Sequence, residues 1–268
     1  MSAIHGPGCP PNSFLLRTAV VIPALNEEGC VRFTVHYWRG RGASLVRVVD
    51  NGSRDATARR ASEAKAEVLH EPARGYGAAA WRGCQQLPPG IEWILFSSAD
   101  GSDRLETEEA AAFDAAARSG ADLIIGERVS RTESRAHLKP AQKFGNWLCC
   151  ALIALGWGRR FADMGSLRVI RRAALERLAL RDRGFGWNIE MQVRALEARL
   201  SIVEVAVRYH PRLAGEPKIS GSVAGTLRAG WVMLRTLCEL YQRRAAPPHT
   251  HRTEQERERE ILNHTGRC

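Results

Sequence analysis

The chain has 268 residues, of which 44% are hydrophobic and 25% are charged, an ordinary globular composition with one substantial core. No stretch reaches the roughly 18 uninterrupted apolar residues that a membrane-spanning helix needs, so the chain is not expected to cross a bilayer. Its net charge of +10 suits ligands that carry phosphate, an anionic membrane surface or nucleic acid, and does not choose among them.

The cysteines and the N-terminal residues bear on the cellular compartment. The seven cysteines form no CxxC pair and no metal-ligand spacing, and their odd number favours free thiols in a reducing compartment. The first 14 residues lack the basic and apolar regions of a secretory signal. We therefore expect a cytoplasmic protein, with peripheral contact at the cytoplasmic membrane face left open.

Short apolar runs alternate with helical patterns in the first half of the chain. Strands are expected at residues 18–22, 45–49, 66–69, 91–97 and 121–125. Helices are expected to start near Asn26 and Asp55, and to cover 78–86 and 106–119. This alternation predicts an α/β fold with a mostly parallel central sheet flanked by helices. Ligands of such sheets bind beyond the carboxyl ends of the strands, where polar residues of this chain fall: Asn26, Asp50, Arg74, Asp100 and Arg128.

The second half begins with a basic loop (128–143) and an apolar segment (147–157). Helices are then expected near 171–179 and 188–198, a strand at 201–209, and an amphipathic helix at 223–241. The expected domain organisation is a flexible tail at 1–16, one domain at 17–241, and a charged, disordered tail at 242–268.

Acidic residues follow two of the expected strands. Asp50 begins an Asp-Asn-Gly-Ser segment, and its carboxylate could accept hydrogen bonds from a base or a ribose. The segment Asp100-Gly101-Ser102-Asp103 offers hard oxygen ligands that suit Mg²⁺ or Mn²⁺. Taken singly, each segment is more typical of an ordinary turn than of a binding site.

Several motifs occur together and in a fixed order. VIPALNEE, VVDNGSRDAT, RGYGAA and SSADGSD each follow an expected strand. Together they resemble family 2 glycosyltransferases of the GT-A fold, a Rossmann-like fold of nucleotide-diphospho-sugar transferases. The downstream motifs DLIIGER, KFGN, FADMGSLRVIRR, WNIEMQVRA and VRYHPRLAGEPKISG are similar to the dolichyl-phosphate mannose synthase branch and its soluble bacterial relatives. The resemblance covers residues 18 to 235.

The resemblance implies a hexosyltransferase that is metal-assisted and inverting. It would move a hexose from UDP-glucose or GDP-mannose to polyprenyl phosphate or another lipid. Many relatives continue into transmembrane helices where this chain turns charged, so a soluble hydroxyl acceptor stays open as the main variant. A non-catalytic nucleotide-sugar binding module is a further alternative. Nucleic-acid binding is not expected, because the chain lacks the corresponding motifs and interleaved aromatic residues.

The resemblance also implies roles for individual residues. The expected donor site comprises Pro23, Asn26, Glu27, Asp50, Arg74, Gly75, Ser98, Asp100, Arg212 and Lys218. The expected ligands of the Mg²⁺ or Mn²⁺ ion are Asp100, Ser102 and Asp103. Relatives usually have Asp-Ala-Asp where this chain has Ser98-Ala99-Asp100. The neutral oxygen of Ser98 would weaken metal binding unless Asp103 compensates.

The chemistry of the acceptor decides whether a base is needed. A phosphate acceptor is already anionic, whereas a hydroxyl acceptor must lose a proton as it attacks. The resemblance places Asp163 and Glu190 on the acceptor side as candidate bases, with Asp163 slightly favoured, and they complete the expected catalytic set with Asp100. Without that role, Glu190 would pair with Arg194 four residues on, and Asp163 would cap a loop.

Two further features bear on a lipid acceptor. In the basic loop, Arg128, Lys139 and Lys143 are candidate ligands of a lipid phosphate, although such loops are often simply solvated. The segment from Trp147 to Trp157 is too short to span a membrane and fits either an interfacial helix or a buried one. Peripheral membrane contact and homo-oligomerisation are therefore further expected interactions.

Overall fold

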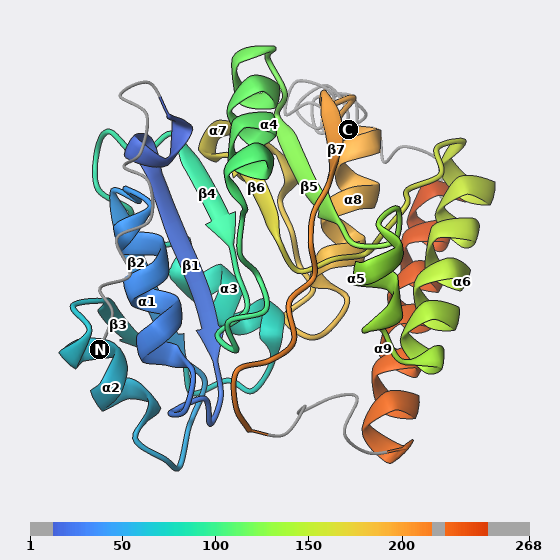
Figure 1. Cartoon of the computed structure of the whole chain (residues 1–268). Helices are drawn as coiled ribbons and strands as arrows, with labels where there is room; N and C mark the ends of the chain where they lie inside the picture. The colour runs from blue at the N-terminus through green and yellow to red at the C-terminus, as the bar shows by residue number, and fades with distance from the viewer. Residues whose placement is uncertain (1–12, 216–222, 246–268) are drawn as a thin grey trace, which may run out of the picture.

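The computed structural model describes residues 13–215 and 223–245. A seven-stranded sheet lies at the centre of this part of the chain, with helices on both faces (Figure 1). The strands are β1 (Thr18–Ala24), β2 (Leu45–Asp50), β3 (Glu67–His70), β4 (Trp93–Phe96), β5 (Leu123–Glu127), β6 (Arg168–Arg171) and β7 (Ile202–Ala206).

The sheet has the strand order β3-β2-β1-β4-β6-β5-β7. β1 pairs in parallel with β2 and β4, β2 with β3, and β5 with β7. Only β6 is reversed in this sheet, since it runs antiparallel to both β4 and β5. The predicted α/β fold with a mostly parallel sheet is therefore confirmed. The other six strands end at one edge, the lower edge in Figure 1, which we call the carboxyl edge.

Two layers of helices cover the sheet. They comprise α1 (Val31–Gly40), α2 (Thr57–Glu63), α3 (Tyr76–Gly83), α4 (Thr107–Arg118), α5 (Thr132–Ala136), α6 (Pro140–Trp157), α7 (Arg172–Leu178), α8 (Trp187–Glu197) and α9 (Val223–Ala245). Alternate residues of a strand point to opposite faces, so Val20 packs against α1, α2 and α4, whereas Val21 packs in the core that includes α3 and α6 to α9. None of the described helices is long and apolar enough to cross a membrane.

The N-terminal residues correct one predicted boundary. A short 3-10 helix covers Phe14–Arg17, and Phe14 is buried against Trp93 and Phe113. Residues 13–16 therefore belong to the folded part, because an aromatic anchor fixes them, and the predicted tail at 1–16 was too long. At the other end α9 continues to Ala245, beyond the predicted limit at 241. Residues 1–12 and 246–268 lie outside the described part.

Three internal elements also differ from the prediction. β6 was not predicted at all. Much of the predicted basic loop is helical, since α5 covers Thr132–Ala136 and α6 begins at Pro140. The first helix begins at Val31 rather than near Asn26. Asn26 adopts a positive φ of 51°, which a helix cannot continue through, and its backbone amide donates a hydrogen bond to the Ser53 hydroxyl at 2.9 Å.

Candidate active site

The loops after β1 and β2 are joined at the carboxyl edge. The Asn26 side-chain oxygen accepts a hydrogen bond from the Arg54 amide at 2.8 Å, and the Glu27 amide donates to the Thr57 hydroxyl at 2.8 Å. Asp50 ends β2 and is almost fully buried, with one carboxylate oxygen 3.4 Å from His70 Nδ1. The predicted donor residues Asn26, Glu27 and Asp50 thus belong to one connected set of loops.

Arg74 and Gly75 follow β3 and reach the same loops. Gly52 lies close to the Arg74 guanidinium, because a Cβ placed on this glycine would be 3.6 Å from it. The Gly75 amide donates to the Asn51 side-chain oxygen at 2.9 Å. Pro23 stands in β1 opposite Val49 of β2. The structure therefore brings these three predicted donor residues to the Asp50 turn.

Arg212 connects two carboxylates from different strands. One guanidinium nitrogen lies 3.1 Å from Asp100 Oδ2, and another lies 2.6 Å from Glu27 Oε2. The second oxygen of Asp100 accepts hydrogen bonds from the amide and the hydroxyl of Ser102, at 3.0 and 2.6 Å. Glu27 follows β1 and Asp100 follows β4, so the parallel pairing of these strands places the two carboxylates together.

The segment that carries Arg212 packs directly on the turn that carries Asp100. The Leu213 amide donates to the Asp100 carbonyl at 3.1 Å, and the His210 amide donates to the Ser102 carbonyl at 3.4 Å. Gly101 has a φ of +75°, and a Cβ there would be 2.5 Å from Leu213 Cδ1, so the turn needs a glycine. Lys218, the other predicted ligand of the diphosphate, lies outside the described residues.

Asp103 has a different environment from Asp100. Its carboxylate accepts hydrogen bonds from the Ser98 amide at 2.7 Å and from the Ser166 hydroxyl at 2.9 Å. Burial, followed by the negative charge of Asp100, raises the pKa of the Asp103 carboxyl, and these hydrogen bonds oppose the shift. The Ser98 hydroxyl points to Ser166, at 3.2 Å. Asp103 and Ser98 therefore hold the turn together, and Asp100 presents the carboxylate that is better placed for a cation.

The Asp100 and Glu27 carboxylates share one cationic partner, Arg212, and carboxylate oxygens are the ligands that a divalent cation such as Mg²⁺ prefers. Mg²⁺ is usually held in proteins by one or two carboxylates together with phosphate oxygens of the substrate. The Arg212 guanidinium shows that this pair already attracts positive charge. No group of three or more His, Cys, Asp or Glu side chains with metal-site geometry occurs in the described ranges. Asp103 and Ser102 as ligands remain predictions.

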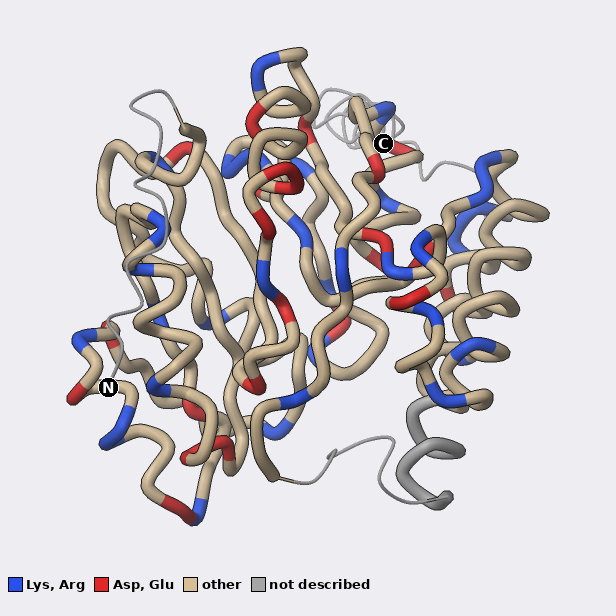
Figure 2. Tube along the Cα trace, in the orientation of Figure 1, with Lys and Arg blue, Asp and Glu red and all other residues tan. Residues whose placement is uncertain are grey.

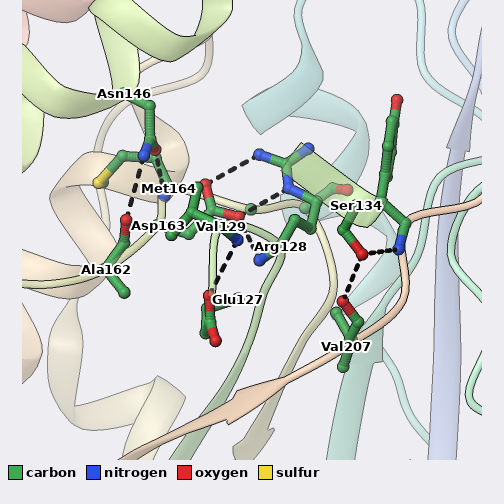
Figure 3. Close-up of polar contacts among 12 residues, drawn as sticks. Glu127, Arg128, Val129, Ser134, Asn146, Ala162, Asp163, Met164 and Val207 are labelled. Atoms are coloured by element: carbon green, nitrogen blue, oxygen red, sulfur yellow. Dashed lines mark hydrogen bonds and ion pairs between the residues drawn. The ribbon is translucent and has the colours of Figure 1, made fainter. Parts of the chain in front are cut away.

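Asp163 forms a second charged centre, which Figure 3 shows in close-up. The Arg128 guanidinium binds both carboxylate oxygens, at 2.7 and 3.0 Å, and its backbone amide donates to the same carboxylate at 3.0 Å. Burial alone would raise the pKa of the fully buried Asp163 carboxyl, but the charge and hydrogen bonds of Arg128 outweigh it and hold the pKa below its ordinary value. Arg128 also lies over the Tyr209 ring, 5.3 Å from its centroid.

Glu190 lies in α8 and is almost fully buried. One carboxylate oxygen accepts hydrogen bonds from the amides of Arg181 and Asp182, at 2.8 and 2.7 Å. The other oxygen lies 4.0 Å from Arg194 Nε and 3.8 Å from an Arg243 guanidinium nitrogen. Glu190 therefore holds the loop before α8, and neither it nor Asp163 has an oxygen without partners.

The predicted acceptor residues Lys139 and Lys143 lie at the start of α6. Lys139 is exposed immediately before the helix, and Lys143 is half-buried in its first turn. Arg128, the third predicted acceptor ligand, is paired with Asp163. A role of the two lysines in acceptor binding remains a prediction.

Sequence reasoning did not single out four residues that organise these centres. They are Ser166, Tyr209, Asn146 and the fully buried Arg168. Arg168 donates to the carbonyls of Gly165 and Asn188, so its charge is held by backbone oxygens. The serine in the DMGS motif was visible beside Asp163, but its bond to Asp103 depends on the reversed strand β6, which the sequence did not reveal.

The sequence is similar to those of known glycosyltransferases. A family model described as Glycosyl transferase family 2 matches residues 19–179. An uncharacterized glycosyltransferase of Mycobacterium tuberculosis is 33% identical over 216 residues, which are 78% of this chain and 93% of the relative. An undecaprenyl-phosphate mannosyltransferase of Micrococcus luteus is 28% identical over 78% of this chain and 90% of its own. A polyprenol monophosphomannose synthase of Mycolicibacterium smegmatis is 29% identical over 77% and 82%.

Solved structures share the arrangement of the sheet and helices. Mannosyl-3-phosphoglycerate synthase from Rubrobacter xylanophilus superposes with a TM-score of 0.65 at 16% identity, over 91% of this chain and 83% of that one. Glucosyl-3-phosphoglycerate synthase from Mycobacterium tuberculosis, in complex with Mn²⁺, UDP-glucose and phosphoglyceric acid, superposes with a TM-score of 0.64 at 18% identity, over 89% and 86%. At these identities the likeness concerns the fold.

Proposed function

Because this chain belongs to glycosyltransferase family 2 and has the GT-A fold, we propose that it transfers a hexose from a nucleoside diphosphate sugar to a polyprenyl phosphate. That it is a glycosyltransferase confirms the prediction from the motifs. The proposed donor is UDP-glucose or GDP-mannose. Relatives named as an undecaprenyl-phosphate mannosyltransferase and a polyprenol monophosphomannose synthase support the lipid acceptor.

One observation carries the choice of a phosphate acceptor. The two carboxylates that could act as bases are both buried and fully engaged, Asp163 by Arg128 and Glu190 by the amides of Arg181 and Asp182. A hydroxyl acceptor would require one of them to leave its partners and take a proton. A phosphate oxygen already carries the negative charge needed for attack, so this site can act on it without a base. That Asp163 or Glu190 acts as a general base remains a prediction.

The proposed reaction exchanges one bond at the anomeric carbon of the hexose. An acceptor phosphate oxygen attacks this carbon from the face opposite the diphosphate and forms the new C–O bond. The bond to the diphosphate breaks, and its electron pair leaves with the nucleoside diphosphate, which inverts the configuration. Asn26, Asp50 and Arg74 would hold the nucleoside, and Arg212 would turn from the carboxylates to the negatively charged leaving group.

Asp100 and Glu27 would hold the proposed Mg²⁺ or Mn²⁺ together with donor oxygens. Bound there, the ion would supply positive charge to the departing diphosphate. The presence of Mn²⁺ in the structure of glucosyl-3-phosphoglycerate synthase supports a divalent ion. The identity of the ion, a cytoplasmic location and homo-oligomerisation all remain predictions.

The proposal is tested by measuring nucleotide release and transfer together. Purified protein with Mn²⁺ is given UDP-glucose or GDP-mannose, with and without a short-chain polyprenyl phosphate dispersed in detergent. We expect release of the nucleoside diphosphate to depend on the acceptor and to match the glycolipid formed. Release without any acceptor phosphate, coupled to glycosylation of a soluble alcohol, would contradict the lipid phosphate, and binding without release would indicate a binding module.

A matched pair of variants tests the metal assignment. Asp100→Asn removes a charge but keeps the shape, and we expect turnover to fall at least about 100-fold, the loss typical of one lost electrostatic contact to a transition state. Glu108→Gln removes an exposed carboxylate on α4 and should leave turnover unchanged. Undiminished turnover in Asp100→Asn, with folding verified by circular dichroism, would refute the role of Asp100.

A further inference from the structure

The outer face of α6 is apolar and exposed. Phe144, Trp147 and Leu155 are 63%, 53% and 81% exposed, and the Phe144 and Trp147 rings lie 6.1 Å apart. These positions recur at helical spacing, so they form a single stripe along the helix. The opposite face, with Cys149, Cys150 and Ile153, is buried in the core. We call Phe144, Trp147 and Leu155 the α6 apolar stripe.

The charged residues of the sequence segment that carries this stripe have one sign. From Ser134 to Arg160 the sequence contains five Lys or Arg residues and no Asp or Glu. Lys139 and Lys143 precede Phe144 and Trp147 in the first turns of the helix, and Arg160 is exposed just beyond its end. In Figure 2 the blue segments that mark Lys and Arg lie toward the two ends of α6, and the middle of the helix is uncharged. An apolar stripe with positive charge at its ends complements a surface that has an anionic outer layer over an apolar interior.

α6 and α9 pack side by side and both begin near the carboxyl edge of the sheet (Figure 1). The Tyr241 hydroxyl of α9 donates to the Leu152 carbonyl of α6 at 2.5 Å, and the Tyr241 ring stacks edge-on against Trp157. Trp231, which is 70% exposed, lies ten residues before Tyr241 and thus about 15 Å nearer the carboxyl edge. The exposed aromatic residues of both helices are therefore concentrated toward the edge that carries the candidate active site.

The same helix is bonded to the Asp163 loop. Asn146, between Phe144 and Trp147 in sequence, accepts a hydrogen bond from the Met164 amide at 2.7 Å and donates to the Ala162 carbonyl at 3.1 Å (Figure 3). These two bonds hold the backbone on both sides of Asp163, whose carboxylate binds Arg128. A partner bound to the outer face of α6 would therefore be held at a fixed position relative to the Arg128–Asp163 pair.

We propose that the α6 apolar stripe, together with Trp231, docks this enzyme on an anionic lipid bilayer, with Lys139 and Lys143 facing the headgroups. Aromatic side chains partition into the headgroup region, and nearby Lys and Arg side chains add attraction to anionic lipids. A second copy of the chain fits this face less well, because a two-fold interface would bring the two basic borders together. The inference extends the proposed function, since a bilayer is where a polyprenyl phosphate would be met.

Vesicle flotation without donor or acceptor tests the docking by itself. The full chain should float with phosphatidylglycerol vesicles and much less with phosphatidylcholine vesicles. Phe144→Gln combined with Trp147→Gln should weaken binding at least about tenfold, given the apolar area removed. Leu16→Gln is the matched control, because Leu16 is also exposed and apolar but lies in the N-terminal 3-10 helix.

Charge and depth are tested with two further comparisons. Lys139→Glu combined with Lys143→Glu should weaken binding to anionic vesicles several-fold, whereas Arg118→Glu on α4 should not. Brominated lipids should quench fluorescence in the native chain and quench it less in Trp147→Phe, with Trp81→Phe on α3 as the control.

The results separate docking from catalysis. Docking is supported if the Phe144 and Trp147 double variant keeps full turnover of a short-chain acceptor in detergent but turns over a long-chain acceptor in vesicles more slowly than the native chain. Equal flotation of this variant and the native chain would overturn the proposal. So would a native dimer that the double variant converts to a monomer without any vesicle binding, since that result assigns the face to a second copy. Failure of all turnover with flotation intact would refute the proposed function alone.

Discussion

Arg212 lies where two acidic side chains would otherwise repel each other. Its guanidinium contacts both Glu27 and Asp100, and its side chain is only 17% exposed. A divalent ion binding to these carboxylates must compete with this arginine. We therefore predict that Arg212→Gln tightens Mn²⁺ binding to the nucleotide-free protein at least a few-fold, because the ion no longer competes with the guanidinium for the two carboxylates.

Electron paramagnetic resonance of free Mn²⁺ during titration measures this affinity directly. The same variant should turn over more slowly, because it lacks a positive charge for the leaving diphosphate. Arg208→Gln, four residues earlier and paired with Glu133 at 3.8 Å, serves as the control. Weaker Mn²⁺ binding in Arg212→Gln would show that the arginine assists the ion instead of competing with it.

The ion pair between Asp163 and Arg128 should make the stability of the fold depend on pH in the acid range. The pKa of its carboxyl is lower in the folded chain than its ordinary value, so the pair stabilises the fold above that value and is lost as the pH falls through the folded pKa. Asp163→Asn should lower the free energy of unfolding by about 3 kcal/mol at pH 7, because Arg128 loses its buried partner. Urea titrations from pH 7 to pH 3 should show the difference from the native chain shrinking below about pH 4. A constant difference would contradict the assignment.

At the scale of elements, the start of α3 depends on one glycine. Gly75 has a φ of +149°, and a Cβ there would be 2.1 Å from the Arg183 carbonyl oxygen. Gly75→Ala should cost about 3 kcal/mol of stability and also weaken donor binding, because Arg74 precedes it directly. Gly90→Ala is the control that separates backbone strain from steric clash. Gly90 also has a positive φ, but a Cβ placed on it would have no atom within 4 Å. Its cost should be about 1–2 kcal/mol, measured by thermal unfolding.

The sequence predicted the fold well where local patterns decide it. The repeated strand-turn-helix pattern, with acidic residues in the turns after the strands, predicted the parallel part of the sheet and the position of its carboxyl edge. β6 was not predicted because it is a four-residue strand with an arginine at each end, which does not look like a buried strand. The burial of Arg168 depends on backbone carbonyls of other segments, at Gly165 and Asn188. The family resemblance named Arg212, but its contacts with Glu27 and Asp100 join residues 185 and 112 positions apart. Periodicity cannot indicate contacts over such separations.

At the scale of the whole molecule, donor binding should be visible as thermal stabilisation. A ligand at 100 times its dissociation constant adds about 2.7 kcal/mol to the folded state. For a chain of this size that corresponds to a rise in Tm of about 5–10 °C. We predict this rise for the correct nucleoside diphosphate with Mn²⁺ by differential scanning fluorimetry. Asp100→Asn should remove the part that depends on Mn²⁺, and Glu108→Gln should keep it.

The reversed strand β6 also bears on how the protein is made on the ribosome. The first four strands of the sheet, β3, β2, β1 and β4, are neighbours both in space and in the emerging chain. β5 has no direct partner among them, because it joins the sheet only through β6 and β7, which are synthesised later. A nascent chain that has just completed β5 therefore carries an unpaired hydrophobic strand, and slow synthesis between Glu127 and Arg168 should increase its need for a chaperone.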